Sequence, residues 1–323
     1  MTAVAIAATV IATGTGGHLS GGAPSAVSPP AGALVRGVPP YYVLIADVTA
    51  ITVRDTRTGA VLATVHPPRG DSFFTAAAGP DDDSFLLATS PSPRPSSYSV
   101  NPSRLYLLRF NPATHDTTLV RLPTPAVPDV VGLTIAPGGT ELAVASLGPN
   151  GSQLRIFSLS GRLIRQWWEP GTICVLRFAC LSWAASGYLA FLWTNNGTKG
   201  AKEGISVIPA TAASGSLLSR SRLVVAFKEF GPHSPLFETQ ASVLSGDGAT
   251  IAAAVILPRL SAFEEFSAAS GKLTGRFWQS PRTLFTWMVL WGNRTGSTLI
   301  VVAPFPGPAS ALGSRSASSP GAG

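Results

Sequence analysis

The sequence predicts an all-β fold: a β-propeller of five, alternatively six and incomplete, four-stranded blades, with disordered termini. Two recurring segments alternate along the chain. The first is a turn of small residues followed by an apolar strand, and the second is a strand, a turn and another strand. Successive copies of the first segment lie about 47 to 62 residues apart, within or slightly above the repeat periods of propellers.

Both segments recur five times. The turn-plus-strand segment occupies Pro80–Leu87, Pro137–Val144, Ala185–Phe191, Gly246–Ala252 and Arg294–Val301. The strand-turn-strand segment occupies Val53–Val65, Leu108–Leu122, Ile156–Trp167, Ile205–Leu218 and Phe263–Phe277, around the turns Thr58-Gly59, Asn111-Pro112, Ser160-Gly161, Ser214-Gly215 and Ser270-Gly271. A strand that is buried on both faces is continuously apolar, as in Leu142–Ala145 and Leu189–Leu192. The alternating pattern of Arg162–Trp167 is typical of an outer strand partly open to water.

Composition agrees with a large β domain. Hydrophobic residues make up 45% of the chain and charged residues 12%, which excludes a disordered polar protein. The 33 Gly and 28 Pro suit many tight turns, so we expect little helix. Net charge is +7, but no cluster of Lys and Arg accompanies it, and we therefore expect no nucleic-acid partner.

The order of the segments leaves the blade count open. The chain begins with the strand-turn-strand segment and ends with the other one, so N-terminal strands can complete the blade opened by Leu284–Ala303, giving five closed blades. Tyr41–Ile45 reads as one further strand and permits six. The predicted domains are a signal or anchor segment with a Gly/Ser/Pro-rich linker (1–40), the propeller (41–303) and a low-complexity tail (304–323).

The N-terminal segment predicts an extracytoplasmic protein. Ala3–Ala12 is an uninterrupted apolar run, about half the length of a bilayer span, and it matches the core of a signal peptide. No Lys or Arg precedes it. Three interpretations of this run remain open: a signal peptide whose basic start lies further upstream, half of a membrane anchor, or an apolar tail on a cytosolic protein. We expect an exported or membrane-anchored protein.

These residues resemble the exported WD40-like propeller proteins of actinobacteria, most of which are uncharacterised. The resemblance covers residues 41–303 and rests on Thr56–Val65, Ile135–Ala143 and Leu181–Trp183. It implies the fold only. The Gly-His and Trp-Asp pairs of true WD40 repeats are missing, so the side-chain network of that class is not implied.

No catalytic motif stands out. The sequence has no G-x-S-x-G elbow, no H-E-x-x-H and no paired Cys motif, and its four His are far apart, so we expect no metal and no cofactor. The acidic run Asp81–Asp83 occupies the position at which the other copies have a β-turn, and we interpret it as a turn.

Loop position supplies the candidate binding residues. Links of variable length, such as Ser90–Arg104, all emerge on one side of a four-stranded blade, and loops on a rigid scaffold concentrate binding residues. The links that lead to the next inner strand carry six polar candidates for ligand binding: His66, Asp71, Asp129, Glu169, His233 and Glu238. For each of them, an ordinary solvated or strand-capping role is the alternative.

Two further pairs of residues draw attention. In a strand, Trp167 and Trp168 point to opposite faces, so one ring packs between blades and the other, which we take to be Trp168, can reach solvent and bind a partner; core or inter-blade packing is the alternative. Cys174 and Cys180 lie close enough in sequence to pair as a disulfide in an oxidising compartment; two free buried thiols are the alternative.

Three functional hypotheses remain. The first is a non-enzymatic extracytoplasmic propeller that binds a protein or small ligand through its variable-loop face. The second is a propeller enzyme, such as a lactonase-like hydrolase or a quinone-dependent oxidoreductase, with scattered site residues. The third is the sensory ectodomain of a membrane-anchored regulator. The sequence identifies neither the partner nor the oligomeric state.

Overall fold

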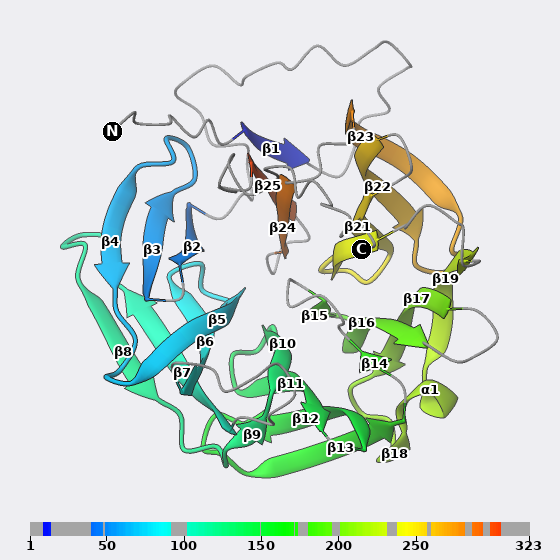
Figure 1. Ribbon diagram of the computed structural model, residues 1–323, viewed down its shortest axis with the longest axis horizontal. Helices are drawn as coiled ribbons and strands as arrows, with labels where there is room; N and C mark the ends of the chain where they lie inside the picture. Colours follow the sequence, from blue (N-terminus) through cyan, green and yellow to red (C-terminus); the bar gives the residue numbers. More distant parts are fainter. Residues whose placement is uncertain are drawn as a thin grey trace, which may run out of the picture.

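The strands of the chain are arranged in sheets around a ring, as Figure 1 shows in a view down the shortest axis. This computed structural model describes residues 9–13, 40–47, 49–91, 102–148, 150–170, 172–173, 180–195, 201–230, 238–256, 260–281, 286–292 and 298–304. The predicted all-β propeller is confirmed. Among the described residues, one short helix is present, and no helix is long and apolar enough to span a membrane.

Four sheets each contain four main antiparallel strands, three of them with one additional short strand, and we number them blades 2 to 5. Blade 2 contains β5 (Asp71–Ala78), β6 (Ser84–Pro91), β7 (Pro102–Phe110) and β8 (Thr117–Arg121). Blade 3 contains β10 (Val130–Ile135), β11 (Glu141–Gly148), β12 (Gly151–Ser158) and β13 (Leu163–Glu169). Blade 4 contains β15 (Leu181–Trp183), β16 (Tyr188–Asn195), β17 (Ala201–Pro209) and β19 (Arg222–Phe230). Blade 5 contains β20 (Glu238–Leu244), β21 (Thr250–Ile256), β22 (Leu260–Ser267) and β23 (Leu273–Pro281).

Two three-stranded sheets lie at the start and the end of the ring (Figure 1). Blade 1 contains β2 (Tyr41–Asp47), β3 (Ala50–Asp55) and β4 (Val61–Val65). Blade 6 contains β24 (Thr286–Gly292), β25 (Thr298–Pro304) and β1 (Thr9–Thr13). A strand from the N-terminal region therefore completes the sheet of β24 and β25, as expected, but this strand is β1, because β3 already pairs with β2 and β4. β1 overlaps the end of the apolar run Ala3–Ala12, which the sequence assigns to a signal or anchor.

Short elements lie in two links between blades and in one connection within blade 4. β9 (Val127–Pro128) pairs with β7, and β14 (Thr172–Ile173) pairs with β16. β18 (Gly215–Ser216) and the four-residue helix α1 (Leu217–Arg220) lie between β17 and β19.

The second strand of a blade is the most deeply buried. Every residue of β6 from Ser84 to Ser90 is buried, whereas β8 has only half-buried and exposed positions and β13 has a single buried one. Apolar residues of neighbouring blades meet in three clusters, one between blades 1 and 2, one between blades 2 and 3, and one that runs through blades 3, 4 and 5. Blades 2, 3 and 4 thus bury apolar residues against both of their neighbours, as the unbroken apolar runs predict.

Two glycine turns allow neighbouring blades to approach closely. Gly161 has φ +86° and Gly271 has φ +69°. A Cβ at Gly161 would lie 2.2 Å from the carbonyl oxygen of Pro123, and a Cβ at Gly271 would lie 1.9 Å from that of Val224. The Ser-Gly turns therefore serve two purposes, since glycine supplies the left-handed backbone and leaves room for the previous blade.

The sequence prediction fails in one hairpin. Ile205–Leu218 was expected to form a strand, a turn and another strand, but the antiparallel partner of β17 is β19, which begins at Arg222. Ser214 and Gly215 lead instead into β18, which runs parallel to the end of β13, and Ser216 caps α1 through its side chain. The physical reason lies in blade 3, because β13 offers its open edge and the Glu169 carboxylate to this segment.

The two sides of the ring differ in their connections. We call the side with the links β4–β5, β6–β7 and β11–β12 the loop face, and the side with the turns β3–β4, β5–β6, β7–β8 and β10–β11 the turn face. The turns on the turn face are short, apart from the β17–β19 connection. The links on the loop face differ in length, from two residues (149–150) to ten (92–101), as the sequence predicts.

Trp167 is the largest fully buried side chain, and it joins blade 3 to blade 4. We expect Trp167→Ala to lower the free energy of unfolding by about 3–5 kcal/mol, because it opens a cavity and leaves the Ala213 carbonyl without its indole donor. Urea denaturation measures this change. The matched control is Trp168→Ala, at the exposed neighbour, for which we expect less than about 1 kcal/mol; equal losses in both variants would contradict the assignment of these rings.

Candidate functional site

Asp71 stands at the loop-face end of blade 2, where it forms a buried polar cluster. Its Oδ1 and Oδ2 lie 2.7 and 2.9 Å from Nη1 of Arg104, and its Oδ2 accepts a hydrogen bond from the Thr89 hydroxyl at 2.8 Å. The Asp71 side chain is 3% exposed and that of Arg104 is 39% exposed. The three residues belong to β5, β6 and β7, so the cluster fixes the end of the blade from which the link 92–101 departs.

Glu169 joins blade 3 to blade 4. Its Oε2 accepts hydrogen bonds from the Ser216 hydroxyl at 3.2 Å and from the backbone N–H of Leu218 at 3.1 Å. The carboxylate thereby satisfies an N–H group in the first turn of α1, which has no partner within the helix. Glu169 is therefore occupied by contacts that hold the β17–β19 connection against β13.

Other side chains of β13 hold the same connection. Arg165 Nε donates to the Ala210 carbonyl at 2.9 Å, and Trp167 Nε1 donates to the Ala213 carbonyl at 2.9 Å. Arg222 of β19 repeats the arrangement one blade further, with Nη2 donating to the Ala268 carbonyl at 2.9 Å. These contacts from an outer strand to the next blade were not found in the sequence, because scattered Arg residues carry no positional signal without the repeat register.

The remaining loop-face candidates are dispersed. His66 is exposed, and its Nδ1 lies 3.1 Å from the Thr49 carbonyl oxygen in the β2–β3 hairpin. Asp129 lies between β9 and β10, and its carbonyl accepts from the Leu147 N–H at 3.0 Å. Glu238 is the first residue of β20, and His233 lies outside the described residues. The hydrogen bonds of the His66, Asp71 and Glu169 side chains go to residues outside the six candidates, and the role of all six in binding stays a prediction.

Trp168 is placed as expected, whereas only one of the two cysteines lies among the described residues. Trp168 is 40% exposed and Trp167 is fully buried, as the alternation along a strand predicts. Cys180 is buried, with Sγ 3.4 Å from the Val131 carbonyl oxygen. Cys174 lies outside the described residues, so the pairing of the two cysteines stays a prediction.

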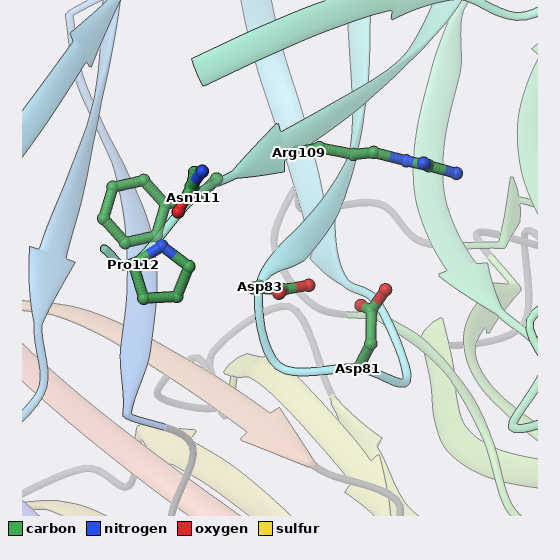
Figure 2. A pocket seen from close by; sticks show the side chains of 6 residues that line it. Asp81, Asp83, Arg109, Asn111 and Pro112 are labelled. Atoms are coloured by element: carbon green, nitrogen blue, oxygen red, sulfur yellow. The ribbon is translucent and has the colours of Figure 1, made fainter. Parts of the chain in front are cut away.

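A pocket of about 430 Å³ opens on the turn face of blade 2, away from the predicted site. It is lined by Asp81, Asp83, Arg109, Phe110, Asn111 and Pro112. Figure 2 shows both carboxylates on the β5–β6 turn, with Asn111 and Pro112 at the end of β7. The acidic run is a turn, as interpreted from the sequence, with Asp82 at φ +61°. Asp81 Oδ1 accepts from the backbone N–H of Ser84 at 3.1 Å and from the Ser84 hydroxyl.

The electrostatics of this pocket raise the pKa of Asp83. Burial raises the pKa of Asp83 above its usual value, and the charge and hydrogen bond of Asp81 raise it further. The Asp83 backbone and Arg109 act in the opposite direction but do not cancel the shift. No group of three or more His, Cys, Asp or Glu that could hold a metal ion occurs among the residues the structure describes.

Comparisons with known proteins return structural likeness alone. No protein-family model matches the chain, and no curated protein matches its sequence. Among solved structures, the chain is similar to an oligogalacturonate lyase in complex with manganese (11% identity, 83% of this chain and 74% of that chain, TM-score 0.47). It is also similar to TolB from Acinetobacter baumannii (12%, 81% and 63%, TM-score 0.47) and to the Cps50 (Swd1) β-propeller domain of Myceliophteria thermophila (12%, 81% and 79%, TM-score 0.41). At these values the likeness carries no argument about function.

The buried ion pair of blade 2 yields a stability prediction. Asp71→Ala removes the acceptor of both Thr89 and Arg104, and we expect the free energy of unfolding to fall by about 2–3 kcal/mol, less than for a fully buried pair because Arg104 keeps some solvent. Urea denaturation is the measurement. Asp116→Ala, in the exposed β7–β8 turn, is the control; an Asp71→Ala variant as stable as this control would contradict the structural role.

The raised pKa of Asp83 yields a pH prediction. The folded chain holds the proton of Asp83 more tightly than the unfolded chain, so ionisation costs stability once the pH rises through the folded-state pKa. We expect Asp83→Asn to raise the melting temperature slightly at neutral pH, with the gain shrinking as the pH falls through the folded-state pKa and vanishing below the unfolded-state pKa. Thermal melts from pH 3 to pH 8 test this; a variant less stable than the parent at pH 7 contradicts it.

Proposed function

We propose that this chain is a non-enzymatic, extracytoplasmic propeller that binds a protein or a small ligand through its loop face. The observation that carries the proposal is the asymmetry between the two sides of the ring. Links of unequal length gather on the loop face, whereas short turns occupy most of the turn face. Variable loops held by a rigid scaffold are the usual place for a binding site.

The contacts at the base of the link 92–101 support the loop face as the binding site. Residues 92–101 leave β6 and enter β7 beside the Asp71–Arg104 ion pair, which ties the three inner strands of blade 2 together. A link anchored in this way can present side chains to a partner at a low cost in entropy, because its ends are already fixed.

The described candidate acids support binding over catalysis. Asp71 is engaged with Arg104 and Thr89, and Glu169 is engaged with Ser216 and the N–H of Leu218. A carboxylate that acts as a general base or metal ligand needs an oxygen directed at the substrate or the metal. In our proposal these two acids stabilise the scaffold, and the contacts with the partner come from the links.

The N-terminal sequence supports the extracytoplasmic part of this proposal. The apolar run Ala3–Ala12 matches the core of a signal peptide, and an extracytoplasmic site would expose the loop face to ligands outside the cell.

A loop replacement tests the proposed face. The purified full chain is screened against secreted proteins and small molecules, and any binder is then tested on a variant in which an equal-length Gly/Ser segment replaces residues 92–101. We expect this replacement to weaken binding at least tenfold, because the segment supplies contacts.

The control variant carries the same Gly/Ser segment inserted after Ala113, in the exposed β7–β8 turn on the opposite side. We expect it to bind as the parent does. A binder that loses affinity for the control but not for the loop-face variant would contradict the proposal.

A further inference from the structure

A polar patch with an exposed tryptophan lies on the side of blade 3 that faces blade 2. The strand register places Gln153 of β12 opposite Trp168 of β13, and Arg155 opposite Gln166. Trp167 and Arg165, the alternate residues of β13, make their contacts with blade 4. The side chains of Gln153, Arg155, Gln166 and Trp168 therefore share the opposite side of the sheet.

The patch begins where the apolar core between blades 2 and 3 ends. Val144 of β11 is in register with Arg155, and it belongs to that core. Gln153, Arg155 and Gln166 are half-buried, and Trp168 is 40% exposed. On β11, the residue in register with Gln153 is Ser146, whose buried Oγ has no hydrogen-bond partner. The patch thus combines a partly open aromatic ring with polar groups that are not fully satisfied.

Arg155 gives the patch its charge. Its Nη2 donates to Gln153 Oε1, and the described part of the chain offers it no carboxylate. Burial lowers the pKa of Arg155, although a guanidinium remains protonated at neutral pH. A half-buried cation without an acidic partner favours an anion, and the planar guanidinium suits a carboxylate in particular.

The bond to Arg155 also orients Gln153. Because Oε1 of Gln153 accepts from Arg155, the amide nitrogen is left to donate to a ligand. Gln166 can both donate and accept. Two amides beside an exposed indole match a ligand that carries several hydroxyl groups and a flat C–H face.

The neighbouring strand edge argues against a peptide. An extended peptide commonly binds by adding a strand to an open edge. Beside Trp168 this edge is taken, because β18 pairs with β13 at Trp167 and Trp168.

We propose that Trp168, Arg155, Gln153 and Gln166 form a binding site for a sugar that bears a carboxylate. The pyranose ring stacks on the Trp168 indole, Arg155 pairs with the carboxylate, and the two glutamines bind hydroxyl groups. The site lies on the side of a blade, so it goes beyond the proposed loop-face function and does not depend on it.

Calorimetric titration of the full chain tests the proposal, with glucuronic acid oligomers as the probe and their carboxyl-reduced neutral counterparts as the comparison. We expect the acidic oligomers to bind at least tenfold more tightly than the neutral ones, with an affinity that falls as salt rises. We expect Trp168→Ala and Arg155→Gln each to weaken binding at least tenfold.

Two control variants remove the same residue types elsewhere. Tyr188→Ala removes an exposed aromatic ring of blade 4, and Arg162→Gln removes an exposed cation of the β12–β13 turn. We expect both to bind within twofold of the parent. The variant with residues 92–101 replaced should also keep its sugar affinity, which separates this site from the loop face.

Three results would overturn the proposal: no binding by the parent, full binding by Trp168→Ala, or tighter binding of a Glu-rich peptide than of the acidic oligomers at the same residues. Trp168→Ala is the decisive variant, because its exposed position predicts a normally folded protein, which circular dichroism checks. If Arg155→Gln fails to fold, Gln166→Ala replaces it, with the same expected loss.

Discussion

The structure depends on burial between neighbouring blades. A single blade exposes apolar residues on both of its faces, so it is stable only with another sheet on each side. The three apolar clusters meet this need, since each of them joins strands of adjacent blades. Closing the strands into a ring allows the described blades to be covered without a long exposed apolar face.

Polar contacts fix how each blade sits against the next. Arg165 and Trp167 of blade 3 donate hydrogen bonds to the β17–β19 connection, and Glu169 accepts one from it. Arg222 of blade 4 donates to blade 5 in the same way. The hydrophobic effect is not directional, whereas these bonds have a defined geometry. These bonds therefore fix the orientation of blade 4 against blade 3 and of blade 5 against blade 4.

The ring was predictable from sequence because its signals are local. Apolar runs such as Leu142–Ala145 and left-handed glycines such as Gly161 identify strands and turns without knowledge of any distant contact. The hairpin expected around Ser214-Gly215 failed for the opposite reason: its course is decided by Glu169 and the edge of β13, more than forty residues earlier in the chain. The roles of the polar candidates could not be predicted for the same reason. The ion pair between Asp71 and Arg104, for example, can be recognised only once the register of β5, β6 and β7 is known. The patch around Trp168 likewise needs the register of β12 and β13.

Hydrogen–deuterium exchange of the full chain tests most directly whether the blades are stabilised by one another. If they are, the backbone amides of the second strands, β6, β11, β16 and β21, become protected to a similar degree and lose protection together as urea is added. Independent loss of protection, with one blade opening at much lower urea while its neighbour stays closed, would contradict this account of a ring held together by its inter-blade cores.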